Sequence, residues 1–146
     1  MALRRMDNVA VVVEDLDAAV AFFTELGMEL EGRASLGGEV VDRLVALDDT
    51  RSEIAMMRMP DGAGGIELTR WEHPRAVGPD PRHEPSNARG MGRVMFEVDD
   101  IEDVVERLQA VGGELVGEIV QYEDAYRLCY LRGPEGIIVA LAQELS

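Results

Sequence analysis

Few side chains in this sequence could carry out covalent or acid–base catalysis. All 14 basic residues are arginine, and the absence of lysine excludes Schiff-base chemistry and a lysine general base. The single cysteine, Cys129, excludes an intramolecular disulfide and a cysteine metal cluster, and its alternating surroundings predict a buried strand residue. His73 and His83 stand alone in a proline-rich segment, where we expect exposed loop residues. Catalysis or binding would therefore depend on carboxylates, arginines and tyrosines.

Composition limits the partners of the protein. A net charge of −15 argues against binding to nucleic acid or anionic membranes, because both need a basic surface. No apolar run approaches the ~18 residues of a membrane span, and the first residues do not resemble a targeting signal. We therefore expect a cytoplasmic protein that binds a small molecule. The length of 146 residues fits one domain.

The sequence contains one motif twice, 85 positions apart and without a gap. Residues 6–32 align with residues 91–117, and Asp15 falls on Asp100 and Gly27 on Gly112. The turn at Pro60-Asp61-Gly62 is echoed later by Pro134-Glu135-Gly136. Self-similarity of this kind indicates two copies of one supersecondary unit.

Each copy predicts the order βαβββ. The first strands are residues 8–13 and 93–98, and each is followed by a helix with Asp15 or Asp100 as its N-cap and a glycine at its end. Later strands are expected at residues 29–35, 52–58 and 66–71, and at 114–122, 125–132 and 137–142. Residues 38–47 form an insertion with Val40, Val41, Leu44 and Leu47 at helical spacing, which predicts a short helix.

We therefore predict one α+β domain over residues 1–146. Module 1 covers about residues 1–72, a linker about 73–89, and module 2 about 90–146. The proline-rich linker is too long for a tight connection, so it either wraps the other half or lies across the mouth of a site.

The repeat resembles the vicinal oxygen chelate superfamily of glyoxalases, bleomycin-resistance proteins and extradiol dioxygenases. The similarity lies in DNVAVVVEDLDAAVAFFTELGMELEG, GRVMFEVDDIEDVVERL, PDGAGGIELTRW and PEGIIVALAQE. It implies tandem βαβββ modules whose strands form a curled mixed sheet, a half-barrel cup with the helices outside. It also implies a homodimer.

The resemblance also implies where a metal would be bound. Metal-binding members usually place His, Glu or Gln, His, and Glu at four strand positions in the cup. Those positions here are Asn8, Glu67, Arg93 and Ala140. Alanine offers no donor, and arginine is a permanent cation without a lone pair to give. We therefore expect no metal and no other cofactor.

Strand alternation supplies the rest of the candidate site. Asn8, Glu67 and Trp71 share the face of their strands away from the helix, and so do Arg93 and Met95. Arg93 and Glu67 could form an ion pair at the position of the metal and offer a fixed cation to a ligand. Alternatively, they could neutralise each other and fill the cup, so that no ligand binds. The segment QYEDAYRLCY adds Tyr122, Tyr126 and Arg127, which could line one wall of a ligand site. Aromatic residues are also common in ordinary strands, which would give the same pattern.

Three functions compete. The first is metal-independent binding of a small, anionic or planar molecule in the cup. The second is a cofactor-independent lyase or isomerase acting on a small carbonyl compound, in which Glu67 moves a proton and Arg93 holds the enolate. The third is a metal-dependent lyase of the lactoylglutathione-lyase type with replacement ligands. Whether the protein is an enzyme therefore stays open at this point.

Overall fold

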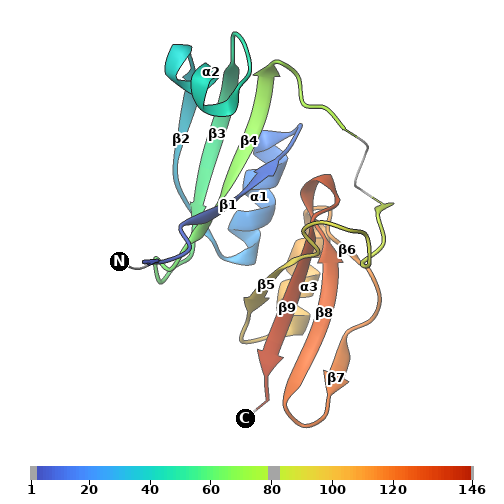
Figure 1. Ribbon diagram of the computed structural model, residues 1–146. Coiled ribbons are helices and arrows are strands. Elements are labelled where there is room, and N and C mark those ends of the chain that lie inside the picture. The colour runs from blue at the N-terminus through green and yellow to red at the C-terminus, as the bar shows by residue number, and fades with distance from the viewer. Residues whose placement is uncertain (1–2, 79–82, 146) are drawn as a thin grey trace. The chain divides into compact units, whose positions relative to one another are not determined.

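A computed structural model describes residues 3–78 and 83–145 of the chain. These residues form two compact units, the first ending at Gly78 and the second comprising the described residues after it (Figure 1). Each unit contains one mixed sheet and one long helix. The α+β class and the tandem βαβββ modules predicted from the sequence are confirmed.

The first unit carries a four-stranded sheet. Its elements are β1 (Asn8–Val12), α1 (Leu16–Leu26), β2 (Glu29–Gly37), α2 (Glu39–Val45), β3 (Arg51–Arg58) and β4 (Gly65–His73). The strand order is β1-β4-β3-β2, with β1 parallel to β4 and the other neighbours antiparallel. Strand β4 runs to His73, so the prediction that this histidine lies in the linker was wrong.

The second unit repeats this plan with one change. Its elements are β5 (Val94–Glu97), α3 (Ile101–Ala110), β6 (Glu114–Leu115), β7 (Val120–Tyr122), β8 (Tyr126–Arg132), the 3-10 turn η2 (Pro134–Gly136) and β9 (Ile138–Glu144). The sheet order is β5-β9-β8-β6, and β7 also pairs with β8. As in the first unit, the strand that precedes the long helix pairs in parallel with the last strand.

The single strand predicted over residues 114–122 is split into β6 and β7. Leu115 pairs with Leu131, and the next pair is Val120 with Leu128. Residues 116–119 thus stand opposite only two residues of β8, so the ladder cannot continue through them. Val116 still donates its N–H to the Tyr130 carbonyl, which keeps the segment against the sheet.

The two long helices begin and end where the sequence predicts. Asp15 accepts a hydrogen bond from the Ala18 N–H at 3.0 Å, and Asp100 accepts one from the Asp103 N–H at 3.2 Å. These carboxylates satisfy N–H groups that have no partner inside the helix. Gly27 ends α1 at φ 124°, a conformation that favours glycine because it has no side chain.

Each helix buries one face of its sheet. In the first unit Phe22 and Phe23 of α1 are at most 1% exposed and lie above Ala55, Met57 and Leu68. In the second unit Leu108 of α3 packs in the same way, in a core that also holds Leu131 and Leu141. Burial of each large apolar side chain contributes about 1.5–3 kcal/mol, so these faces dominate the stability of each unit.

Among the described residues of each unit, no long helix covers the opposite face of the sheet, and we call this face the helix-free face. Polar contacts to the helix side identify the two faces: Arg33 pairs with Asp17 of α1, and Gln143 accepts the first N–H of α3. The residues between them in the strand alternation point the other way. Val12 and Met95, on the helix-free faces, are about half exposed, at 48% and 50%.

The insertion forms the predicted short helix, α2, but its apolar residues are not in a core. Val40, Leu44 and Leu47 are exposed, and α2 buries none of its residues. The helix is held instead by Asp42, which is described below. None of the helices in residues 3–78 and 83–145 combines the length and apolar character that crossing a membrane requires.

The cap of α1 gives the first prediction. Replacing Asp15 by Ala removes the acceptor of the Ala18 N–H, and we expect a loss of about 1 kcal/mol in the free energy of unfolding. Asp15→Asn should lose much less, because asparagine also caps helices. Urea unfolding followed by circular dichroism measures both variants. Asp48→Ala, an exposed loop substitution, is the control, and an equal loss in this control would contradict the role of the cap.

Candidate functional site

Three of the predicted site residues lie on the helix-free face of the first sheet. Glu67 is half-buried and stands between Ala10 and Met56 in the strand register. Its only hydrogen bond among the described residues is a long one, 3.4 Å from the Thr69 hydroxyl. Trp71 is half-buried further along β4, opposite Ser52. Asn8 is exposed at the start of β1, and its amide donates to Asp7 at 2.8 Å.

The helix-free face of the second sheet contains a cavity of about 330 Å³. Its walls come from β5, β8 and β9, and it is lined by Met95, Glu97, Tyr126, Leu128, Ala142 and Glu144. The register explains this set, because Glu97, Ala142 and Leu128 are consecutive partners across the three strands. Met95 and Tyr126 were predicted from the sequence as ligand-binding residues. The two glutamates and Leu128 were missed, although the same alternation could have found them.

Arg93 and Ala140 lie beside the cavity, Arg93 just before β5 and Ala140 on β9. The guanidinium carbon of Arg93 lies 5.2 Å from the centre of the Tyr130 ring, a cation–π contact. Ala140 is fully buried between Met95 and Tyr130 in the register. Because its side chain is a single methyl group, Ala140 fills little space on this face.

The tyrosines and Arg127 do not form one wall. Tyr122 pairs with Tyr126, and Tyr130 follows on the same face of β8. Arg127 lies on the opposite face, where its guanidinium donates to Glu102 of α3 at 2.6 Å. The reason is the two-residue period of the strand, which alternates neighbouring side chains between faces. We therefore leave Arg127 out of the candidate site.

The predicted residues thus form two groups. Asn8, Glu67 and Trp71 belong to the first unit, and Arg93, Met95, Tyr122, Tyr126 and Ala140 belong to the second. The ion pair between Glu67 and Arg93, and the cup shared by both sheets, remain predictions.

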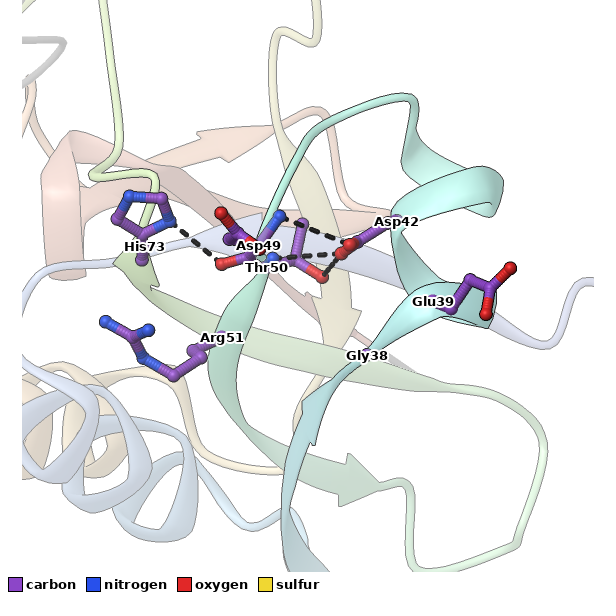
Figure 2. Close-up of a pocket in the computed structure, with 7 residues that line it drawn as sticks. All are labelled: Gly38, Glu39, Asp42, Asp49, Thr50, Arg51 and His73. Carbon is purple, nitrogen blue, oxygen red and sulfur yellow. Dashed lines mark hydrogen bonds between the residues drawn. The ribbon is translucent and has the colours of Figure 1, made fainter.

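A second, polar pocket of about 450 Å³ lies in the first unit beside α2 (Figure 2). It is lined by Gly38, Glu39, Asp42, Asp49, Thr50, Arg51 and His73. Asp42 accepts hydrogen bonds from the Asp49 N–H at 3.2 Å and the Thr50 N–H at 2.9 Å, and also from the Thr50 hydroxyl. Sequence reasoning missed this pocket, because nothing in the repeat points to residues that only the insertion brings together.

These bonds define the electrostatics of Asp42. The side-chain hydrogen bond from Thr50, followed by the bond from the Thr50 backbone N–H, lowers the pKa of the Asp42 carboxyl below its ordinary value. In the other unit, burial raises the pKa of the Cys129 thiol. A protonated, buried thiol is a poor nucleophile, which agrees with the structural role predicted for it.

The four positions at which related proteins hold a metal do not fit one here. Asn8 and Glu67 are the only oxygen donors among them, Ala140 has none, and Arg93 is a cation. Within residues 3–78 and 83–145, no group of three or more histidine, cysteine, aspartate or glutamate side chains is placed to hold an ion. The side chains at these four positions therefore differ from the ligands that the family resemblance implies for a metal site.

The family model for the Glyoxalase/Bleomycin resistance protein/Dioxygenase superfamily matches residues 5–141 of the chain. The chain belongs to this superfamily. A solved glyoxalase family protein from Bacillus cereus is 53% identical, with a TM-score of 0.95, over 100% of this chain and 97% of that one. The resemblance that was stated from the sequence motifs is thus confirmed. No curated protein sequence matches the chain.

Solved structures of lower sequence identity share the fold. A glyoxylase/bleomycin resistance protein/dioxygenase domain from Frankia is 20% identical, with a TM-score of 0.67, over 98% of this chain and 99% of that one. An antibiotic binding protein from Streptomyces is 21% identical, with a TM-score of 0.61, over 99% and 98%. At these identities the likeness concerns architecture, which in this superfamily supports several chemistries.

The second prediction concerns Asp42 and pH. Because its folded-state pKa is lowered, its contribution to stability is present at neutral pH and is lost as the pH falls through the folded-state pKa. The difference in unfolding free energy between the unmodified protein and Asp42→Asn should therefore be largest near neutral pH. It should shrink below about pH 4, where the unfolded aspartate also becomes protonated. Denaturant unfolding across this range measures it.

Asp48→Asn is the matched control, since Asp48 is an exposed loop aspartate close to the same pocket. Its stability difference should stay nearly constant with pH. A constant difference for Asp42→Asn as well would contradict the role given to its hydrogen bonds.

Proposed function

We propose that this protein binds a small, planar and largely apolar molecule without a metal, and that the helix-free face of the second sheet is the principal binding surface. The observation that carries the proposal is the cavity beneath Met95, Tyr126 and Leu128. A volume of about 330 Å³ is at the lower end of ligand pockets, which usually span roughly 300–1,000 Å³.

The lining of this cavity favours a flat ligand. Tyr126 and Met95 are 42% and 50% exposed, so both can cover a ligand without unpacking the core. Aromatic rings prefer offset or edge-to-face contacts with other rings, and methionine adapts its shape to neighbours. Tyr122 extends the same surface through its pairing with Tyr126.

The charges on this face would orient the ligand. Arg93 lies over Tyr130, the partner of Ala140 on β8, and can pair with an anionic or electron-rich group. Glu97 and Glu144 line the cavity beyond it and make no ion pair within the described residues, so they favour a basic or hydrogen-bond-donating group. The sequence predicted an anionic ligand. The two kinds of charge on this face instead favour a ligand with an anionic or electron-rich group at one end and a basic or hydrogen-bond-donating group at the other.

Relatives support binding as the kind of activity. The Streptomyces protein with the same fold is an antibiotic binding protein. The donor set at the four metal positions argues in the same direction, since Arg93 would repel a cation and Ala140 cannot coordinate one. A metal-dependent lyase is therefore the weakest of the three functions.

A cofactor-independent lyase or isomerase is the second candidate, and Glu67 favours it. This carboxylate is half-buried on the helix-free face and has no ion pair within the described residues, so it could accept a proton from a carbonyl compound. Arg93 would then stabilise the enolate. Solvent deuterium uptake by a bound ketone that Glu67→Gln abolishes, with binding retained, would favour this candidate over binding alone.

The third prediction tests the cavity with 8-anilino-1-naphthalenesulfonate, an aromatic anion whose fluorescence rises on transfer from water. Tyr126→Ala and Met95→Ala should each weaken its binding by about tenfold, because each removes a contact of roughly 1–1.5 kcal/mol. Fluorescence titration gives the dissociation constants. Met6→Ala is the matched control, as Met6 is 75% exposed and lies outside the cavity. Equal binding by all variants would remove the cavity as the site.

The fourth prediction concerns metal content. Protein purified without chelator should contain no stoichiometric Zn, Ni, Fe or Mn, and Arg93→Gln should weaken binding of the same probe without adding a metal. A metal site should require Asn8→His, Arg93→His and Ala140→Glu together, because only this combination supplies a donor side chain at all four predicted positions and removes the cation. Elemental analysis of each protein is the measurement. One metal per chain in the unmodified protein would favour the metal-dependent lyase.

A further inference from the structure

The polar pocket beside α2 is built on a web of hydrogen bonds that joins three segments. Asp42 of α2 holds the backbone of Asp49 and Thr50, as described above. The carbonyl of Asp49 in turn accepts a hydrogen bond from Nδ1 of His73 on β4, at 2.8 Å. Gly37 is in close contact with the Thr50 carbonyl, where a side chain would not fit. The hydrogen bond from Nδ1 to the Asp49 carbonyl, in a loop that Asp42 holds in place, therefore fixes the orientation of the His73 ring.

The same hydrogen bond defines the chemistry of the ring. A carbonyl oxygen only accepts, so Nδ1 must carry the hydrogen. Nε2 makes no hydrogen bond within the described residues and is available to a ligand. In the imidazolium form both ring nitrogens of a histidine are donors, so Nε2 could then donate to an anion.

Arg51 is the partner of His73 across the sheet. The two residues are partners on the antiparallel strands β3 and β4, next to a shift in the register, and both line the pocket. Figure 2 shows both on the same side of the pocket, with Glu39 at the other side. Arg51 makes no ion pair within residues 3–78 and 83–145. Its five N–H donors are therefore available to an oxyanion.

Three acidic residues also line the pocket and limit what it can hold. The Asp42 carboxylate is occupied by three donors, whereas Glu39 on α2 and Asp49 in the loop carry uncompensated charge. Their repulsion lowers the affinity for any anion and selects for a small one that reaches only Arg51 and His73.

We propose that Arg51 and Nε2 of His73 form a binding site for the oxyanion of a small carboxylate or phosphate, separate from the cavity on the second sheet. The guanidinium of Arg51 takes two oxygens, and the protonated imidazole takes one. The site is independent of the proposed ligand-binding function and belongs entirely to the first unit.

The fifth prediction uses NMR of the full chain. The sequence contains two histidines, so the ring signals of His73 can be followed with those of His83 as an internal reference. Titration with inorganic phosphate, at constant pH and ionic strength, should shift the His73 signals along a saturable curve and leave His83 unchanged. Acetate in a second titration distinguishes the two sources, since the anion with the tighter curve is the better model of the ligand.

Three variants test the two side chains. Arg51→Gln should weaken phosphate binding by about tenfold, because a charge-assisted bidentate contact is lost. His73→Asn should also weaken it, since an asparagine amide can replace Nδ1 toward Asp49 but offers nothing in place of Nε2; here the backbone amide signal of Arg51 reports binding. Arg70→Gln is the control, with the same charge change on the same sheet at a residue that does not line the pocket and that donates to the Glu14 carbonyl instead. A shift that does not saturate, or that is equal in Arg51→Gln, means an adventitious ion only and overturns the proposal.

Discussion

Each sheet of this protein is buried by a long helix on one face only. The period of two along a strand separates residues that must pack against α1 or α3 from residues that need not. On the helix side, Leu68 and Leu131 are fully buried. On the other side, Val12 and Met95 remain about half exposed, although both are apolar. The helix side provides the stability of each unit, which leaves the helix-free sides to differ in chemistry within the superfamily.

The chemistry of those helix-free sides departs from the metal-binding pattern that the family resemblance implies. The positions are retained, but their side chains are an amide, a carboxylate, a guanidinium and a methyl group. Arg93 stacks on Tyr130, and Ala140 is covered. A cation–π contact at an exposed site contributes about 0.5–1 kcal/mol, so Arg93 can exchange this contact for a ligand at modest cost. Binding by aromatic and apolar side chains is then the simplest use of the second sheet.

The insertion between β2 and β3 is held in place by hydrogen bonds and not by apolar packing. Its helix α2 has apolar residues at helical spacing, yet it buries none of them, and a single carboxylate holds the loop behind it. Asp42 therefore replaces a hydrophobic contact as the element that positions Asp49 and, through it, His73. The insertion occurs in only one of the two repeats, and the polar pocket is correspondingly found beside the first sheet.

The sequence by itself determined the repeat, the order of elements, the helix caps at Asp15 and Asp100 and the faces of the strands, because these depend on local periodicity and on contacts within a few residues. It also determined that Ala140 cannot bind a metal, since that follows from residue type. Tertiary structure decided which side chains meet. Arg127 donates to Glu102, and Leu128 lies in register with Ala142 and Glu97. Thr50 donates to Asp42. Strand register and loop closure, which local sequence patterns do not give, bring these residues together. The split of residues 114–122 had the same origin, since only pairing with β8 shows that the segment is two residues too long for a continuous ladder.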